Sequence, residues 1–380
     1  MNENTFTAAP DDLSRETYCI LGIPIDAIEM PAVLRTIDAA AESGRPFILS
    51  TPNLNFLVTS QTDPEFRESV LLSDLCPPDG MPIIWIARLL GIPIKRRVAG
   101  SDIFPALKAR SGLQRPLKIF LFGSTEPVAA AAAEQINSNS VNLKCVGWLC
   151  PQFGNVDELS EDRFIDRINA SNADFLMAAL GPRNGQLWLL RNHFRLRVPI
   201  RAHLGATINF LAGSVKRAPY LVQRLGLEWL YRIKEEPRLF GRYWHDGGVL
   251  LRLLLTRILP LTIAARWWQL RADRGSHDFV IVETHNGPNV TLSISGDATA
   301  KEVPRAIVAF RHAVASQKPV AVDLSRTTAI DPRFFGLFLM LRKLLKGRGF
   351  GLHFVGVSRG LGRQFRLNGI DYLLTPSAQL

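Results

Sequence analysis

Short apolar runs alternate with longer helix-like stretches over roughly the first half of the chain, and this alternation constrains the fold more than any other feature. Short apolar runs are typical of buried strands, and the stretches between them have the length and composition of helices. This order predicts an α/β domain with a Rossmann-like, largely parallel sheet. The expected strands are 18–23, 47–50, 118–122, 174–180 and 198–204, and the expected helices are 30–42, 64–74, 81–90, 127–137 and 186–195.

The loops after the expected strands are the predicted ligand site, because parallel sheets of this kind bind ligands at the carboxyl ends of their strands. These loops are Thr51-Pro52-Asn53, Leu121-Phe122-Gly123-Ser124 and Ala179-Leu180-Gly181-Pro182. No G-x-G-x-x-G sequence follows a strand, so a dinucleotide site is not expected. The four cysteines form no C-x-x-C pair, which predicts neither a disulfide framework nor a zinc site.

Positive charge is concentrated in the second half of the chain. Residues 215–276 hold 12 Lys or Arg against 5 Asp or Glu, and residues 277–380 hold 13 against 7. The whole chain has a net charge of +11, so residues 1–214 carry no basic excess. A positive field attracts nucleic acid, an anionic membrane surface or a diphosphate-bearing substrate, and charge alone does not choose among them.

Residues 215–275 combine this charge with tryptophan and leucine. Four of the seven tryptophans lie here, and the Leu-rich stretch contains Arg252 and Arg257 and is expected to be broken at Pro260. A short apolar stretch with two arginines is a poor membrane-spanning helix, whereas basic helices flanked by tryptophan lie in the membrane interface. The sequence therefore predicts interfacial helices, with a buried helical hairpin as the alternative.

A second, smaller α/β domain is predicted after the Gly275-Ser276 linker. Strand-like runs lie at 289–295, 319–325 and 351–357, and helix-like runs lie at 333–347 and 358–367. The predicted organisation is therefore a catalytic domain at 15–214, a basic amphipathic appendage at 215–275 and a small domain at 277–380.

Asp79 lies in the segment Pro77-Pro78-Asp79-Gly80-Met81-Pro82, directly before an expected helix. Proline is well tolerated in the first turn of a helix, so the helix is expected to begin near Met81. A carboxylate at this place either caps the helix or points at a ligand, and this segment taken alone favours the cap.

Five segments, taken together and in order, resemble the WecG/TagA/CpsF glycosyltransferases, glycosyltransferase family 26. They are TPNLNF from Thr51, PPDGMP from Pro77, RVAGSD from Arg97, GATINFLAGSVKRAP from Gly205 and GLEWLYR from Gly226, and the resemblance spans about residues 18–246. It implies inverting transfer of a sugar, such as N-acetylmannosamine, its uronate or glucose, from a UDP-sugar to a polyprenyl-diphosphate-linked saccharide. It also implies a metal-independent reaction without a cofactor.

The resemblance also implies roles for individual residues. Asp79 matches the family's general base, and inversion requires such a base to deprotonate the attacking hydroxyl. Thr51 joins Asp79 in the catalytic pair, and cations or backbone N–H groups must stabilise the departing diphosphate. Each implied cation is equally compatible with a solvated surface charge. The implied substrate-binding residues are Asn53, Arg97, Gly123, Gln186, Gly205, Lys216, Arg217, Arg224 and Arg232.

The chain departs from the family pattern after the strand that ends at Leu180-Gly181. Family members usually carry P-K-Q-E there, whereas this chain has Pro182-Arg183-Asn184-Gly185-Gln186. The glutamine is displaced by one position and the acidic residue is absent. Either Gln186 replaces the family's glutamine through a shifted loop, or donor recognition differs.

Residues 279–374 resemble a STAS domain of the anti-sigma-factor-antagonist type, carried by 320–349 and the strand and helix that follow. In phosphorylated members a serine follows the aspartate at the helix start, but here Asp331 is followed by Pro332 and Arg333. A phosphoserine switch is therefore not expected, and docking of a protein partner is the preferred role.

The functional hypothesis is an active transferase of cell-surface or exopolysaccharide biosynthesis, peripheral on the cytoplasmic face of the inner membrane. Its expected partners are the UDP-sugar, the lipid-linked acceptor and the anionic membrane surface, and a homo-oligomer is compatible with the sequence. The alternative is a non-catalytic membrane scaffold that uses the STAS-like domain. Nucleic-acid binding is not expected, because the Leu-rich stretch 249–263 suits lipid better than stacked bases.

Overall fold

The computed structural model describes residues 11–110, 115–151, 154–216, 218–219, 222–223, 226–272 and 278–375. Packing divides the chain into two compact units that alternate along the sequence. One contains Ile28–Ile84 and Lys95–Val249, and the other contains Met1–Ala27, Trp85–Ile94 and Leu250–Leu380. This division follows packing, whereas the domain limits 15–214, 215–275 and 277–380 follow sequence patterns and remain predictions.

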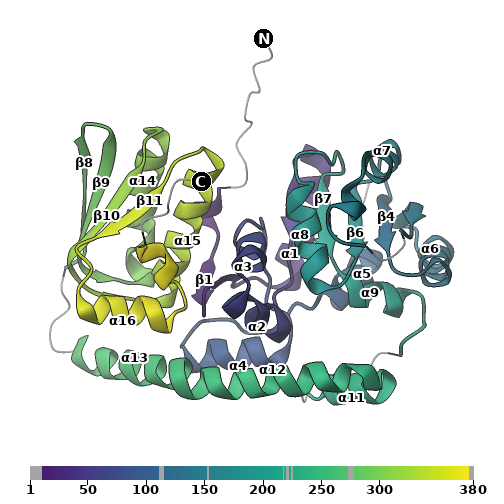
Figure 1. The fold of residues 1–380 in the computed structure, drawn as a ribbon, viewed down its shortest axis with the longest axis horizontal. Helices are drawn as coiled ribbons and strands as arrows, with labels where there is room; N and C mark the ends of the chain where they lie inside the picture. The colour runs from purple at the N-terminus through teal and green to yellow at the C-terminus, as the bar shows by residue number, and fades with distance from the viewer. Residues whose placement is uncertain are drawn as a thin grey trace, which may run out of the picture. The chain divides into compact units, whose positions relative to one another are not determined.

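A five-stranded parallel sheet forms the centre of the first unit (Figure 1). Its order is β3-β7-β6-β4-β5, and every adjacent pair is parallel, as the alternating sequence pattern predicts. The strands are β3 (Phe47–Leu49), β4 (Leu117–Gly123), β5 (Leu143–Leu149), β6 (Phe175–Ala179) and β7 (Ile200–His203).

Alternate residues of these strands enter two separate cores, one on each face of the sheet. In β4, Ile119 and Leu121 pack on one face, whereas Phe120 and Phe122 pack on the other. The helices α1 (Met30–Ser43), α5 (Gly100–Ala109), α6 (Glu126–Asn139) and α9 (Gly205–Leu211) cover the first face, and α7 (Asp162–Ala170) and α8 (Pro182–Arg191) cover the second. Within the described residues, the helices α2 (Leu54–Thr62), α3 (Pro64–Leu71) and α4 (Met81–Leu89) lie between β3 and α5 in the sequence, and α11 (Glu228–Glu235) follows α9.

The expected strand at 18–23 is wrong as a member of the parallel sheet. Residues 17–26 instead form an antiparallel hairpin of β1 (Thr17–Ile20) and β2 (Ile23–Asp26). The reason is a two-residue turn, in which Leu21 and Gly22 both have positive φ, 48° and 94°. Such turns match the twist of paired strands and reverse the chain.

The expected break at Pro260 is also wrong, because one helix runs from Pro237 to Arg266. It comprises a 3-10 turn (Pro237–Leu239), α12 (Phe240–Leu253), a π-helical turn (Leu254–Ile258) and α13 (Leu259–Ala272) as far as Arg266. Proline lacks an N–H and its ring clashes with the preceding turn of a regular helix, and the wider π turn just before Pro260 accommodates both defects.

This long helix is apolar and little buried. By length and composition it is able to cross a membrane, and 17% of its most apolar window is buried. The alternative of a buried helical hairpin is therefore wrong for the described part of this segment, because the segment forms one largely exposed helix.

The second unit contains a four-stranded sheet in the order β11-β10-β9-β8. Strands β9 (Asn289–Ala298), β10 (Val320–Ile330) and β11 (Leu352–Val355) are parallel, and β8 (Val280–Asn286) is antiparallel to β9. The helices of this small α/β arrangement are α14 (Val303–Ala315), α15 (Pro332–Gly347) and α16 (Arg359–Leu367).

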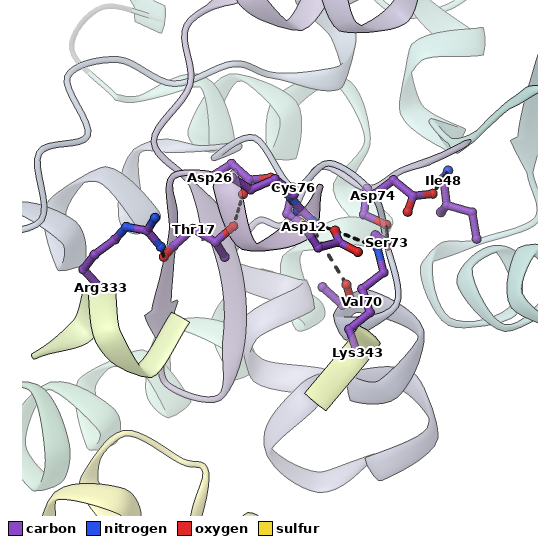
Figure 2. Close-up of polar contacts among 12 residues, drawn as sticks. Asp12, Thr17, Asp26, Ile48, Val70, Ser73, Asp74, Cys76, Arg333 and Lys343 are labelled. Carbon is purple, nitrogen blue, oxygen red and sulfur yellow. Dashed lines mark hydrogen bonds and ion pairs between the residues drawn. The ribbon is translucent and has the colours of Figure 1, made fainter. Parts of the chain in front are cut away.

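The β1-β2 hairpin packs against α15 of the same unit. The Arg333 Nη1 atom donates to the carbonyl oxygen of Thr17 at 2.9 Å, and the Lys343 Nζ atom lies 3.0 Å from Asp12. Figure 2 shows Thr17 between Arg333 and Asp26, whose Oδ1 atom accepts from the Thr17 hydroxyl at 2.5 Å. Because of these contacts, residues before the first unit form an integral part of the second.

Gly336→Ala is expected to lower the free energy of unfolding of the second unit by about 1–3 kcal/mol, the usual cost of overpacking. A Cβ atom at Gly336 would lie 2.1 Å from the carbonyl oxygen of Thr17. Urea unfolding followed by circular dichroism checks this result. Gly347→Ala is the matched control in the same helix, because nothing lies within 4 Å of its Cβ position. Equal stability of the two variants would show that the hairpin does not pack tightly on α15.

Candidate functional site

The carboxyl ends of four neighbouring parallel strands bring the predicted loops to one edge of the sheet. Thr51 follows β3, Gly205 follows β7, and Gly181 follows β6. Gly123 ends β4, and a Cβ atom there would lie 2.6 Å from the carbonyl oxygen of Ala179, so only glycine allows this approach of β4 to β6. The structure thus places Gly123 and Gly205 at the predicted edge.

The loop with Asp79 is fixed by backbone hydrogen bonds to two other motif segments. The Asp79 N–H donates to the carbonyl oxygen of Pro52 at 3.0 Å, and the Val98 N–H donates to that of Pro78 at 2.7 Å. Thr51 is buried, and its Oγ1 atom lies 3.3 Å from the Cβ position of Gly100. Three segments that are separate in the sequence therefore meet around Asp79.

Asp79 does not adjoin the helix that follows it in sequence. Gly80, with φ of +82°, separates it from α4, which begins at Met81. Its carboxylate instead accepts a hydrogen bond from the N–H of Gly100, the first residue of α5. The N-terminus of a helix carries a partial positive charge that favours an anion. The carboxylate is thus held by a helix end that comes from a different motif.

Burial raises the pKa of the Asp79 carboxyl to about 7, against a usual value of 3.8. Arg97 and the Gly100 N–H act in the opposite direction and lower it, whereas the negative charges of Glu228 and Asp102 raise it further. A carboxyl with a pKa near neutrality exchanges a proton readily under physiological conditions, which is what a general acid or base requires.

The charge of Arg97 acts on Asp79, and the Arg97 side chain is held by two residues that were not among the predicted site residues. Its Nη1 atom lies 2.5 Å from Glu228 Oε2 in α11, and its Nη2 atom donates to Gln223 Oε1 at 3.1 Å. Glu228 belongs to the GLEWLYR segment, so its motif was visible in the sequence, but its partner is 131 residues away.

A second long-range contact joins Asn55 of the TPNLNF segment to Asp246. The Asn55 Nδ2 atom donates to Asp246 Oδ2 at 3.2 Å, and Asp246 is buried. Asn53 of the same segment caps α2, with its Oδ1 atom accepting from the Phe56 N–H at 3.1 Å. The only sequence signal for Asp246 is a single acidic residue within an apolar helix.

Gln186 is buried below the strand ends and is bound to the protein itself. Its Nε2 atom donates to the Ser50 hydroxyl at 2.6 Å, and Ser50 lies 2.7 Å from the Ser73 hydroxyl. Within the described part of the chain, the Gln186 Oε1 atom has no hydrogen-bond partner, and neither has Nδ1 of the neighbouring His203. Burial lowers the pKa of His203 to about 4, so this imidazole is neutral at physiological pH.

The predicted phosphate-binding cations differ in their surroundings. Lys216 is exposed after α9. The Arg232 guanidinium lies 5.7 Å from the Phe210 ring and its Nη2 atom lies 3.3 Å from Glu236. Arg217 and Arg224 lie outside the described residues. Convergence of these four cations on one phosphate site therefore remains a prediction.

Comparison with known proteins gives matches over most of the chain. The sequence model of the glycosyl transferase WecG/TagA/CpsF family matches residues 18–262, and a model of the MlaB-type STAS domain matches residues 281–375. An N-acetylglucosaminyldiphosphoundecaprenol N-acetyl-beta-D-mannosaminyltransferase of Bacillus spizizenii is 26% identical over 55% of this chain and 78% of its own. The enzyme of the same name from Bacillus subtilis is 27% identical over 50% of this chain and 72% of its own.

Among solved structures, that of an SsGBP–GDP complex matches 68% of this chain and 90% of its own, with 12% identity and a TM-score of 0.21. A likeness at this level carries no argument about fold or ligand.

Asp79→Asn is expected to stabilise the protein at pH 8 by up to about 4 kcal/mol, at about 1.4 kcal/mol per pKa unit. The folded-state pKa of Asp79 is raised, so the folded state binds the proton more tightly than the unfolded state. Stability contributed by this group is therefore lost as the pH rises from about 4 to about 7. The difference between variant and wild type should vanish towards pH 4.

Urea unfolding at a series of pH values checks this result. Asp166→Asn, at an exposed position of α7, is the matched control and should follow the wild type at every pH. An Asp79→Asn variant with the wild-type pH dependence would mean that the Asp79 pKa is not raised.

Proposed function

This chain belongs to the WecG/TagA/CpsF glycosyltransferase family and is a glycosyltransferase, and we propose that it transfers a sugar from a UDP-sugar to a polyprenyl-diphosphate-linked saccharide with inversion. The names of two relatives support the acceptor class, since both refer to N-acetylglucosaminyldiphosphoundecaprenol. The observation that carries the proposal is the half-buried Asp79, which three family motifs surround and whose pKa lies near neutrality.

Asp79 is the general base of the proposed reaction. The acceptor hydroxyl oxygen attacks the anomeric carbon from the face opposite the nucleotide diphosphate, and a new C–O bond forms as the bond to the diphosphate breaks. The hydroxyl proton passes to the Asp79 carboxylate. A base with a pKa near the working pH combines sufficient ionisation with sufficient basicity.

The departing diphosphate carries negative charge that positive groups must stabilise. Arg97 acts directly on the charge of Asp79, and a guanidinium has five N–H donors, of which Glu228 and Gln223 use two. The remaining donors are available to phosphate in this proposal. Lys216, Arg217, Arg224 and Arg232 supply the further cations, and Thr51, Asn53, Gly123 and Gly205 line the substrate site.

N-acetylmannosamine is the proposed donor sugar, because the names of both relatives specify the N-acetyl-beta-D-mannosaminyl group. The departure at residues 182–186 falls in the first turn of α8, where Arg183 pairs with Asp63 at 2.5 Å. This pair occupies the place where the family carries its P-K-Q-E segment, so a panel of UDP-sugars is needed to define the donor. Gln186 acts on the donor indirectly, because its hydrogen bond to Ser50 anchors the loop that follows β3.

The long helix lies in the membrane interface in this proposal, on the cytoplasmic face of the inner membrane. Its exposed apolar side chains follow one another at intervals of four or seven residues, which is about one or two helical turns. They are Phe240, Trp244, Leu251, Leu255, Leu259 and Ile263. That spacing places them along one stripe, and Arg252 and Arg257 lie on the same helix. An apolar stripe with basic neighbours is typical of helices that lie on anionic membranes.

Asp79→Asn is expected to reduce kcat by about 10²–10⁴-fold, the usual contribution of a general base. The measurement is sugar transfer from candidate UDP-sugars to a polyprenyl-diphosphate saccharide, with Asp166→Asn as the control. Equal turnover by Asp79→Asn and wild type would remove Asp79 as the base. Absence of turnover by the wild type with every donor would support the scaffold alternative.

The double substitution Leu255→Glu and Ile263→Glu is expected to weaken binding to vesicles with anionic lipid by at least about tenfold. Each change removes an apolar side chain worth about 1.5–3 kcal/mol when buried, and adds a charge that the surface repels. Vesicle co-sedimentation measures the binding. Val141→Glu, which changes an exposed valine elsewhere, should leave binding unchanged. Unchanged binding of the double variant would contradict the interfacial helix.

A further inference from the structure

Arg97 interacts with the carboxylates of two distant segments. Glu228 of α11 pairs with its Nη1 atom at 2.5 Å, and Gln223 accepts from its Nη2 atom. Its charge also acts on Asp79 and Asp102. The guanidinium thus links α11 to the loop that holds the base.

The Arg97–Glu228 pair is shielded from solvent. The side chains are 17% and 15% exposed, so their attraction is screened less than that of a surface pair. Burial alone would lower the pKa of Arg97, but the hydrogen bond and the charge of Glu228 outweigh it and raise that pKa. The guanidinium is therefore a permanent cation, and its place beside Asp79 depends on a residue outside the motif loops.

We propose that Glu228 is a positioning residue, whose carboxylate holds the Arg97 guanidinium beside Asp79 and offsets part of its charge there. Through this contact, α11 sets the protonation of the base and the direction of the Arg97 donors. The inference rests on the proposed role of Asp79 as the general base. A merely structural ion pair would tie α11 to the loop without changing how the reaction depends on pH.

The charged groups that act on Asp79 determine the sign of the effect. They are Arg97, Glu228 and Asp102, together with the N–H of Gly100. The charge of Glu228 raises the pKa of Asp79, whereas that of Arg97 lowers it. Removing the negative charge of Glu228 leaves the positive charge of Arg97 less compensated, so the pKa of Asp79 falls.

Glu228→Gln separates charge from shape, because the amide keeps the size of the side chain and an oxygen that accepts from Arg97. The measurement is the pH profile of kcat/KM for sugar transfer between pH 5 and pH 9. In the wild type the rate should fall below about pH 7, where Asp79 becomes protonated. In Glu228→Gln this fall should move to lower pH. If the pKa of Asp79 drops by one, the ionised fraction well below that pKa rises about tenfold, and the relative rate rises with it.

Glu235→Gln is the matched control, because Glu235 is exposed on the same helix α11. It should reproduce the wild-type profile. A Glu228→Gln profile that falls at the wild-type pH would overturn the proposal, provided that Asp79→Asn is inactive. Full activity of Asp79→Asn would instead overturn the role of the base itself, so the two failures are distinguishable.

A double-mutant cycle covers the case in which the charge change disturbs folding. Glu228→Ala and Arg97→Ala are compared alone and together, at the pH where the wild type is fastest. If Glu228 acts through Arg97, the double variant should be no slower than Arg97→Ala. If the activity of the double variant is instead reduced by the product of the two single-variant factors, the proposal is overturned. Urea unfolding of each variant checks that the reduced activity does not come from reduced stability.

Discussion

Asp79 is kept at the first turn of α5, at a half-buried position where the charge of Arg97 acts on it. Desolvation opposes its negative charge, while the helix end and the cation favour it, and the balance leaves the pKa near 7. The surrounding structure maintains this balance. Pro52 and Pro78 fix the loop by backbone contacts, and Glu228 and Gln223 fix the cation.

The small domain and the N-terminal hairpin form one packed unit, because α15 packs against the hairpin. Nearly every residue in the first three turns of α15 is buried, including Arg333 and the three phenylalanines that follow it in this helix. Asp331 caps that helix by accepting from the Phe334 N–H at 2.8 Å, and Pro332 follows it. Asp331 is thus a helix cap, and Pro332, the residue that follows it, has no hydroxyl group, so the absence of a phosphoserine switch stays a prediction.

The periodicity of the sequence predicted four of the five parallel strands and the edge where the site lies. It missed β5, because Lys144 and Gly147 interrupt the apolar run in Leu143–Leu149. It misplaced the hairpin, because a continuous apolar run such as 18–23 does not reveal that Leu21 and Gly22 take positive φ. Proline was expected to break the helix at Pro260, but the helix continues because the π-helical turn before it makes room for the proline ring.

Within the site, the sequence motifs identified the residues of the loops around Asp79, but they did not identify the distant residues that pair with those loops. Asp79, Thr51 and Arg97 stood in recognisable motifs, and the structure brings them together. Glu228 and Asp246 complete the contacts from helices more than a hundred residues away, and no pattern of spacing specifies such a pairing.

The anomeric configuration of the product tests the account of a single displacement with Asp79 as base most directly. With an α-linked UDP-sugar as donor, the one-bond carbon–proton coupling at the anomeric carbon should identify a β-linked product. An α-linked product would contradict the account, because a single displacement from the face opposite the diphosphate inverts the anomeric carbon.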